Sequence, residues 1–582
     1  MAQKRKQEQA RDISLFISKS TTTSRGNKTG SWRFARPRYQ DKTAPCSAAC
    51  PAGVDIPKIE WELAKAEVEK AWEVYMRENP FPAICGRVCF HTCEASCNRS
   101  RLDKPVAINR LDRFLGDAAL DRGRQPTGQK LPANGRKVAI VGSGPAGLSA
   151  AYFLNRLGFA CDIFEAKSQP GGVLQWGIPN YRLPKRVLQQ EIDRIVEMGV
   201  RIHCGKPVNE ELLDYLRSSY HALFIGCGLG RSLDLDIPGS HRMEDGLALL
   251  EAIQNGNPPE IKGDVAVIGG GNTAVDVTRS LIRLGAQPVI LYRRRRKDMP
   301  AFEHEIEAAE AEGARIVELV SPLCIEPCDG QLQIRLAAMK AVGEGEDGRG
   351  CVERDGDREI EMTFSSLFSG IGADVEEAWY RPDAAGSDSL VRLSHCTICF
   401  GNVPVVYGGD PVMPIKSVTD AIASGKQAAI ALHSFFEKGS DAIVPSVERS
   451  RVGPGPSLSL EVYLGGRRKE RHAHVVSAEE INLDYFENKE RLSAPRLSVA
   501  TARTTFDEIE STYAEMDATA EAERCYQCGF CNDCDNCRIF CAEVSIEKVD
   551  GKRQVDLEYC KGCGVCVAEC PRCAMTIEEE QA

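Results

Sequence analysis

The sequence predicts an α/β protein of several domains, with two Rossmann-like dinucleotide-binding domains between two cysteine-rich domains. A chain of 582 residues is too long for a single hydrophobic core. A pattern of strand, glycine turn, helix and strand occurs twice, near residues 137–165 and 264–292. Most of the 25 cysteines fall into two clusters, one near each end of the sequence.

Composition narrows the class of protein before any motif is considered. The sequence is 43% hydrophobic and 27% charged, which is ordinary for a globular protein, and its net charge of −10 disfavours general binding to nucleic acid. No apolar run approaches the ~20 residues of a membrane helix, and the charged N-terminus lacks the apolar stretch of a secretory signal. We therefore expect a cytoplasmic protein that binds neither membrane nor nucleic acid. Clustered cysteines in a reducing compartment indicate metal rather than disulfides.

Two segments precede the first glycine turn. Residues 1–42 contain eleven Lys and Arg against three Asp and Glu, which favours a basic flexible arm over a docking element. Residues 43–130 are predicted to be a helical domain, because residues 54–79 have amphipathic helical spacing. This domain carries two cysteine groups: Cys46 and Cys50, then Cys85, Cys89, Cys93 and Cys97. The grouping favours a [4Fe–4S] cluster over zinc, whose sites more often show paired CxxC knuckles. Six thiolates suffice for one cluster, with two to spare.

Residues 131–260 contain the first glycine turn. In the fingerprint of residues 137–165, Gly142 permits the tight turn, Gly144 lets the backbone approach a pyrophosphate, and Gly147 lets helix and strand pack closely. The phosphates would sit at the helix N-terminus, and Glu165 would accept hydrogen bonds from a ribose. A Gly- and Pro-rich loop follows at residues 169–185 and is expected to line the ligand. The candidate binding residues here are Gly142, Gly144, Pro145, Ala146, Gly147, Glu165, Gly172, Val173, Leu174, Gly177 and Arg182.

Residues 261–390 repeat the pattern with a different strand end. The second strand ends on Arg293 and Arg294, where an NAD site would place an acidic residue. Arginine at this position suits the 2′-phosphate of NADP, and a solvated basic turn is the alternative. Two such folds in one chain suggest FAD in the first and NADP(H), or else NAD(H), in the second. The candidate binding residues of the second site are Gly269, Gly271, Asn272, Thr273, Arg293 and Arg294.

The sequence then returns to the first domain. In residues 391–440, a buried strand ends on Gly409 and Asp410, and a helix rich in small residues follows. An acid at this position suits the ribityl chain of a flavin. Residues 441–520 are polar, have few strong periodicities, and are interpreted as a long connector strap rather than a domain.

Residues 521–582 contain two copies of the bacterial ferredoxin cysteine run and are expected to form a small α+β ferredoxin-like domain. In such runs, the fourth cysteine of each ligates the other cluster. One predicted [4Fe–4S] site is therefore Cys531, Cys534, Cys537 and Cys570, and the other is Cys560, Cys563, Cys566 and Cys541. Cys525 and Cys528 lie upstream of the first run and are either spare or bind something unidentified. Cys573 is also unassigned.

Together these sites predict an oxidoreductase that exchanges electrons between a two-electron and a one-electron carrier. A flavin takes a hydride from nicotinamide and can release electrons singly to iron–sulfur clusters. The alternative is a stand-alone NAD(P)H-dependent reductase of a small organic substrate. That alternative needs a substrate domain, for which the connector strap and the ferredoxin-like segment leave no room.

Residues 31 to about 436 resemble the family of the small subunit of glutamate synthase, which includes the flavin half of dihydropyrimidine dehydrogenase. The matching stretches include CPAGVDIP, PFPAICGRVC with CEASC, GGVLQWGIPNYRLPK, VIGGGNTAVDV, LYRRR and KDMPAFEHE. The resemblance implies a helical N-terminal Fe–S domain, an FAD domain interrupted by a nested NAD(P)H domain, and a hetero-oligomer. The implied partner is a catalytic oxidoreductase subunit, which could be a 2-oxoacid oxidoreductase, an aldehyde oxidoreductase or a glutamate synthase-like subunit. Ferredoxin is the other implied partner.

Two positions depart from this family. Its members usually carry a further CxxC shortly before the position of Cys46, and none is present here. They also use a Gln or Glu as a cluster ligand, and the matching position here is Asp112.

Overall fold

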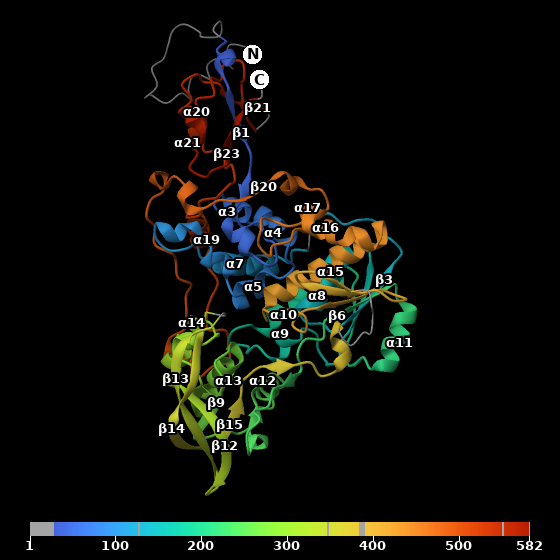
Figure 1. Ribbon diagram of the computed structural model, residues 1–582, viewed down its shortest axis with the longest axis vertical. Coiled ribbons are helices and arrows are strands. Elements are labelled where there is room, and N and C mark those ends of the chain that lie inside the picture. Colours follow the sequence, from blue (N-terminus) through green and yellow to red (C-terminus); the bar gives the residue numbers. More distant parts are fainter. Residues whose placement is uncertain (1–27, 126–127, 346–347, 383–389, 550–551, 581–582) are drawn as a thin grey trace.

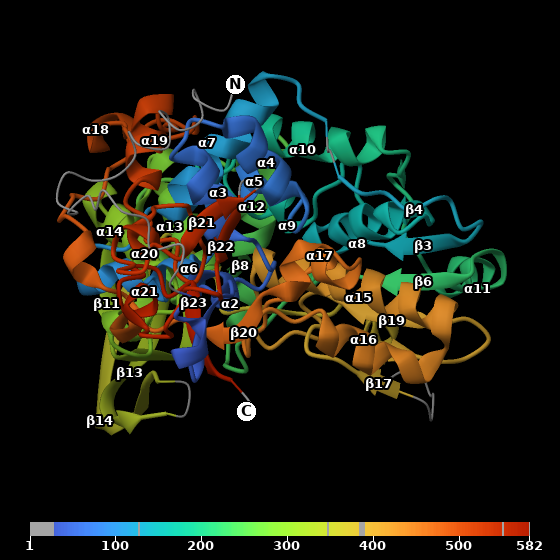
Figure 2. The ribbon, with the colours of Figure 1, turned by 90° about the horizontal axis from the view of Figure 1, so that it is seen from above.

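The structure is a computed structural model that describes residues 28–125, 128–345, 348–382, 390–549 and 552–580. The molecule is elongated (Figure 1). The C-terminal domain lies at one end of its long axis and the second dinucleotide domain at the other, with the helical N-terminal domain between them. The first dinucleotide domain projects to one side, which the view along the long axis also shows (Figure 2).

The N-terminal domain is helical, as the sequence predicts. Two of its helices begin at a proline, Pro45 of α2 and Pro82 of α5, at a position where proline costs no hydrogen bond. Helices α5 and α7 cross closely, because a Cβ atom at Gly86 would lie 2.3 Å from the backbone nitrogen of Arg113. The helices are α2 (Pro45–Ala49), α3 (Ile56–Leu63), α4 (Val68–Met76), α5 (Pro82–Val88), α6 (Thr92–Ala95) and α7 (Ile108–Asp121).

The first dinucleotide domain is built on a seven-stranded sheet of order β17-β18-β19-β6-β3-β4-β5. Its strands are β3 (Lys137–Val141), β4 (Ala160–Phe164), β5 (Arg201–His203), β6 (Ala222–Ile225), β17 (Leu390–Arg392), β18 (Cys396–Cys399) and β19 (Val405–Gly408). Strand β19 pairs in parallel with β6, although the whole second domain separates them in sequence. The second domain is therefore nested within the first. Helix α8 (Pro145–Arg156) is buried between the sheet and α15 (Val418–Lys438).

The second dinucleotide domain has a five-stranded sheet of order β11-β10-β9-β15-β8 and a three-stranded antiparallel sheet of order β12-β13-β14. The strands of the first sheet are β8 (Glu244–Asp245), β9 (Asp264–Ile268), β10 (Gln287–Tyr292), β11 (Arg315–Glu318) and β15 (Ser366–Ser369). Those of the second are β12 (Val320–Cys328), β13 (Gln331–Glu344) and β14 (Gly350–Phe364). Its helices include α12 (Gly246–Gln254), α13 (Asn272–Arg283) and α14 (Glu303–Glu312).

The predicted boundary at residue 260 is wrong. Strand β8 pairs with β15 and α12 packs on α13, so both elements belong to the second domain. The chain passes between the two domains through β7 (Arg231–Ser232) and returns through β16 (Ala373–Asp374), and these two strands pair with each other.

Residues 441–520 run across several domains with short elements only. These are α16 (Ile443–Arg449), α17 (Leu460–Tyr463), β20 (His472–Val475), α18 (Val499–Ala502) and α19 (Glu515–Ala522). Strand β20 pairs with β2 (Lys42–Thr43) of the N-terminal domain. Further along, Arg283 of the second dinucleotide domain donates to the carbonyl oxygen of Thr505 at 2.9 Å. The connector therefore ties the N-terminal domain to the second dinucleotide domain.

The C-terminal domain contains two short helices, α20 (Asn536–Ile539) and α21 (Val565–Ala568), and the hairpin β21 (Ile546–Val549) with β22 (Lys552–Val555). Its last strand, β23 (Met575–Glu579), pairs antiparallel with β1 (Ala35–Tyr39). Strand β1 thereby covers what would otherwise be an open sheet edge.

This pairing corrects part of the predicted flexible arm. Residues 28–42 dock along the C-terminal domain instead of forming a free segment. The remainder of the predicted arm, residues 1–27, lies outside the described residues.

Candidate cofactor and cluster sites

The first glycine turn joins β3 to α8, and each of its three glycines has a different steric environment. Gly142 has a φ of +96°, and a Cβ atom there would lie 2.5 Å from the carbonyl oxygen of Gly226. A Cβ atom at Gly147 would lie 2.0 Å from the carbonyl oxygen of Gly142. Gly144, at the N-cap of α8, has no atom within 4 Å of its Cβ position. The open side of the turn is therefore at the helix N-terminus, where a phosphate fits.

The loop after β4 and the loop after β19 close around this turn. A Cβ atom at Gly172 would lie 2.9 Å from the Cα of Gly144, and one at Gly409 would lie 3.2 Å from the Cβ of Ala146. The structure thus brings Gly144, Gly172 and Gly409 together around α8. The other predicted residues of these loops include the buried Pro145 and Leu174, the exposed Val173, and Gly177, which packs on Val173. Asp410 is half-buried, and burial raises its pKa.

Glu165 holds the glycine turn in place. Its carboxylate accepts hydrogen bonds from the backbone N–H and the hydroxyl of Ser143 at 2.9 and 2.5 Å. It also accepts one from the backbone N–H of Lys167 at 2.8 Å. Glu165, which is predicted to bind a ribose, therefore also stabilises the glycine turn through these hydrogen bonds.

Arg182 lies in the interface between the two dinucleotide domains. Its guanidinium is buried and forms ion pairs with Asp276 of α13 at 2.7 Å and with Glu305 of α14 at 3.3 Å. Its assignment as a cofactor ligand stays a prediction, and these ion pairs give Arg182 a structural role. The sequence could not show this, because its partners lie about a hundred residues downstream.

The second glycine turn repeats the geometry of the first. Gly269 has a φ of +139°, and a Cβ atom there would lie 2.3 Å from the carbonyl oxygen of Gly370. Gly271, at the N-cap of α13, has no atom within 4 Å of its Cβ position. Asn272 follows, and its side-chain oxygen accepts a hydrogen bond from the backbone N–H of Phe302 at 3.0 Å. Thr273 is half-buried in the first turn of α13.

The basic run after β10 divides into two pairs. Arg295 is paired with Asp298 at 2.8 Å, and Arg296 is paired with Glu303 at 2.6 Å and Glu310 at 2.7 Å. Within the described part of the chain, Arg293 and Arg294 have no acidic partner. Their charges are therefore available to an anion at the end of β10.

Two cavities in the C-terminal domain bring together the predicted cluster ligands. One has a volume of about 20 Å³ and is lined by Cys531, Cys534, Cys537 and Cys570. The other also has a volume of about 20 Å³ and is lined by Cys541, Cys560, Cys563 and Cys566. Each cavity thus takes its fourth cysteine from the other run. Among the described residues, no three His, Cys, Asp or Glu side chains form a group suited to one metal ion; the cysteines surround cavities, as four ligands of a cluster do.

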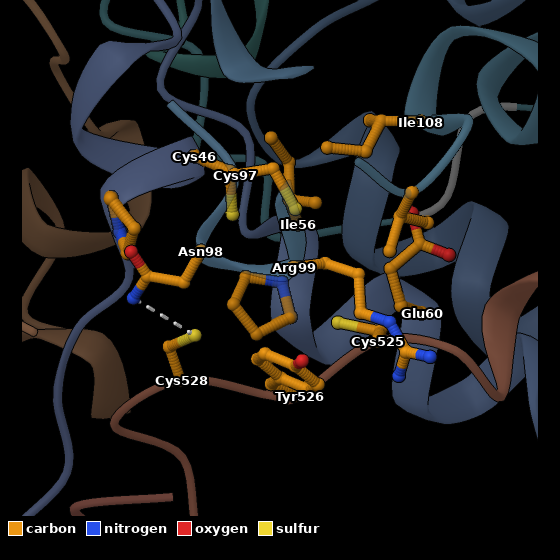
Figure 3. A pocket seen from close by; sticks show the side chains of 13 residues that line it. Cys46, Ile56, Glu60, Cys97, Asn98, Arg99, Ile108, Cys525, Tyr526 and Cys528 are labelled. Carbon is orange, nitrogen blue, oxygen red and sulfur yellow. Dashed lines mark hydrogen bonds between the residues drawn. The ribbon is translucent and has the colours of Figure 1, made fainter. Parts of the chain in front are cut away.

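The six N-terminal cysteines do not form one group. Cys46 and Cys97 line a third cavity with Cys525 and Cys528 of the C-terminal segment (Figure 3). This division was missed in the sequence, because two of the four residues lie at the far end of the chain.

Burial raises the pKa of Cys50, Cys85, Cys89 and Cys93, and the nearby Asp112 adds to each shift. The pKa of Cys93 is raised mainly by its burial, and the neighbouring Cys89 and Cys50 raise it further. Burial likewise raises the pKa of Cys89 to about 12, with Cys50 and Asp112 contributing. The Cys89 thiol also lies 3.7 Å from the hydroxyl of Thr419, in the first turn of α15. This group is therefore next to the helix that follows Gly409 and Asp410.

An aromatic cluster between the N-terminal domain and the second dinucleotide domain was also missed. The ring of Phe302 packs edge-on against Phe90 at 4.9 Å and stacks on His304 at 5.4 Å. The only signal in the sequence was the stretch KDMPAFEHE, which by itself does not indicate a contact.

Comparisons with known proteins match two families along the chain. Residues 33–124 match the family described as dihydropyrimidine dehydrogenase domain II, 4Fe-4S cluster. Residues 136–316 match the family described as pyridine nucleotide-disulphide oxidoreductase. The fold and the cysteine cavities thus define an oxidoreductase of flavin, nicotinamide nucleotide and iron–sulfur type.

Three relatives match far more of the chain. The β subunit of NADP(+)-dependent formate dehydrogenase from Moorella thermoacetica is 32% identical over 84% of this chain and 70% of the relative. The β subunit of NADPH-Fe(3+) oxidoreductase from Geobacter sulfurreducens is 30% identical over 84% of this chain and 76% of the relative. The NAD-dependent dihydropyrimidine dehydrogenase subunit PreT from Salmonella typhimurium is 33% identical over 68% of this chain and 92% of the relative.

The chain belongs to the family of these oxidoreductase subunits. It is an electron-transfer subunit that uses FAD, a nicotinamide nucleotide and [4Fe–4S] clusters, and that works with a catalytic partner subunit. None of the helices in the described ranges has both the length and the apolar character needed to cross a membrane.

Proposed function

We propose that the chain passes electrons between NADP(H), bound in the second dinucleotide domain, and a partner oxidoreductase that docks near the C-terminal domain. The observation that supports this most is the order of the sites along the molecule. The second dinucleotide domain and the C-terminal domain lie at opposite ends, with the cysteine groups of the N-terminal domain between them (Figure 1). Electrons from one end reach a partner at the other only through the middle.

The chain's own residues bind and orient the cofactors. The turn around Gly142, Gly144 and Gly147 would hold the pyrophosphate of FAD, and the turn around Gly269 and Gly271 that of NADP(H). When bound, the flavin accepts a hydride from nicotinamide and releases its electrons singly to iron–sulfur clusters. The buried pairs of Arg182 with Asp276 and Glu305 keep the two nucleotide domains in a fixed relation.

The partner is proposed to be a catalytic oxidoreductase subunit, and free ferredoxin is the second candidate. Two relatives are named as β subunits, one of a formate dehydrogenase and one of an NADPH-Fe(3+) oxidoreductase. We place the protein in the cytoplasm, because 25 cysteines without a disulfide pattern suit a reducing compartment. We expect no binding to membrane or nucleic acid.

Arg293 and Arg294 test the choice of nucleotide. The double variant Arg293→Ala, Arg294→Ala should weaken NADPH binding by more than about 100-fold, because each of the two charge-assisted contacts to the 2′-phosphate contributes about 1.5–3 kcal/mol and about 1.4 kcal/mol is tenfold. NADH, which lacks that phosphate, should lose little. Stopped-flow reduction of the flavin as a function of nucleotide concentration gives both dissociation constants.

Arg296→Ala is the matched control for this test, because Arg296 is already paired with Glu303 and Glu310. It should leave the ratio of the two dissociation constants unchanged. Equal losses for NADPH and NADH in the double variant would refute the 2′-phosphate assignment.

A further inference from the structure

A third four-cysteine cavity lies where the C-terminal segment meets the N-terminal domain. It has a volume of about 20 Å³, the same as each of the two cavities of the ferredoxin-like domain. Cys46 and Cys97 line it from the N-terminal domain, and Cys525 and Cys528 line it from the segment before the first ferredoxin run. Figure 3 shows the two pairs on opposite sides of the cavity.

The backbone of residues 525–529 repeats the turn that begins each ferredoxin run. In each of the three stretches, the residue two after the first cysteine and the residue four after it have positive φ. These residues are Gln527 and Gly529 (47° and 70°), Asp533 and Asp535 (60° and 68°), and Gly562 and Gly564 (71° and 77°). Positive φ is uncommon for Gln and Asp, so the shared pattern is not accidental.

The turn also aims backbone donors at the cysteine sulfur. The N–H of Gln527 donates to the Sγ of Cys525 at 3.3 Å, and the N–H of Gly562 donates to the Sγ of Cys560 at 3.4 Å. The side-chain amide of Asn98 donates to the Sγ of Cys528 at 3.5 Å. Such donors stabilise a thiolate ligand and tune a cluster.

A buried carboxyl group in the same cavity lacks a partner. Glu60 is 1% exposed, and among the described residues neither of its carboxyl oxygens has a hydrogen-bond partner. Buried polar groups are nearly always paired, so an unpaired one indicates a missing group or ion.

We propose that Cys46, Cys97, Cys525 and Cys528 bind a [4Fe–4S] cluster that joins the N-terminal domain to the ferredoxin-like domain. No cysteine lies in residues 28–45, and the C-terminal segment supplies the two further ligands. Cys528 and Cys531, which line neighbouring cavities, are three residues apart, so their Cα atoms are at most about 11 Å apart. The site therefore lies directly beside the first ferredoxin cavity.

Iron content tests the assignment on the full-length chain purified without oxygen. The double variant Cys525→Ser, Cys528→Ser and the single variants Cys46→Ser and Cys97→Ser should each contain about four iron atoms fewer per chain. Each should lack the same component of the EPR spectrum recorded after reduction with dithionite. Adding Cys46→Ser to the double variant should remove no further iron.

Cys573→Ser is the matched control, because Cys573 belongs to the same segment but lines none of the three cavities. Its iron content should equal that of the unmodified chain. Full iron content in the double variant, or one zinc atom per chain that disappears with Cys525 and Cys528, would overturn the proposal.

Two further measurements are needed. One identifies variants that fail to fold, and the other identifies a failure of the proposed electron path. The assignment rests on the iron–sulfur chemistry of the proposed function. FAD content is therefore measured on every sample, and flavin reduction by NADPH on the unmodified chain. If the double variant loses its FAD, the proposal is tested instead by alkylating the cysteines of the unmodified, iron-loaded chain. Labelling of Cys525 and Cys528 under conditions that spare Cys531 would refute the cluster.

Discussion

Gly147→Ala is expected to abolish FAD binding by preventing the first domain from folding. In an isolated helix, alanine would be favoured over glycine by about 1 kcal/mol. Here the added Cβ atom would lie 2.0 Å from the carbonyl oxygen of Gly142 and 3.1 Å from a methyl group of Ile140. Because both belong to the buried strand and turn, the clash outweighs the helix preference. Flavin absorbance after gel filtration and thermal unfolding by circular dichroism measure the two effects.

Gly144→Ala is the control in the same turn. Its φ is −69° and its Cβ position is open, so alanine fits the protein alone. We expect a normally folded protein that binds FAD weakly, because the new methyl group occupies the space for the pyrophosphate. A Gly147→Ala protein with normal stability, or a Gly144→Ala protein with full FAD content, would contradict the account of the turn.

Cys570→Ser is expected to remove the cluster of the first ferredoxin run, although Cys570 belongs to the second run. The reason is that Cys570 lines the cavity of Cys531, Cys534 and Cys537. The loss should be about four iron atoms per chain. Adding Cys531→Ser should remove no more iron, whereas adding Cys563→Ser should remove about four more. Iron and labile sulfide assays on the full-length chain distinguish the two combinations.

The reverse pattern would show that each run keeps its own fourth cysteine. In that case Cys570→Ser with Cys563→Ser would lose one cluster, and Cys570→Ser with Cys531→Ser would lose two. That result would contradict the arrangement of the two cavities.

Features carried by short, local patterns were predictable from the sequence. The roles of Gly142 and Gly147 follow from their spacing, and the structure gives each a steric reason. The crossing of the two ferredoxin runs likewise matches the cavities that contain Cys541 and Cys570. The expected α/β class, the nested domains and the oxidoreductase family follow from the same motifs.

Features that depend on distant contacts were not predictable. The basic composition of residues 28–42 gives no sign that β1 pairs with β23 at the other end of the chain. Cys46 and Cys528 line the same cavity, and this contact between opposite ends of the chain also left no sign in the sequence. Arg182 belongs to a Gly- and Pro-rich loop, and nothing in the sequence indicates that it pairs with Asp276 in the nested domain. In each case the missing information was the three-dimensional path of the chain.

The central claim is that the chain alone connects NADP(H) to its iron–sulfur clusters. The most direct test is to reduce the full-length protein with dithionite under anaerobic conditions, remove the excess, and add NADP+. Cluster EPR, flavin absorbance and NADPH formation are then followed together, and the reverse titration starts from oxidised protein and NADPH. We predict that the cluster signals decrease as NADPH forms. Clusters that stay reduced in the presence of NADP+, and stay oxidised in the presence of NADPH, would contradict the account.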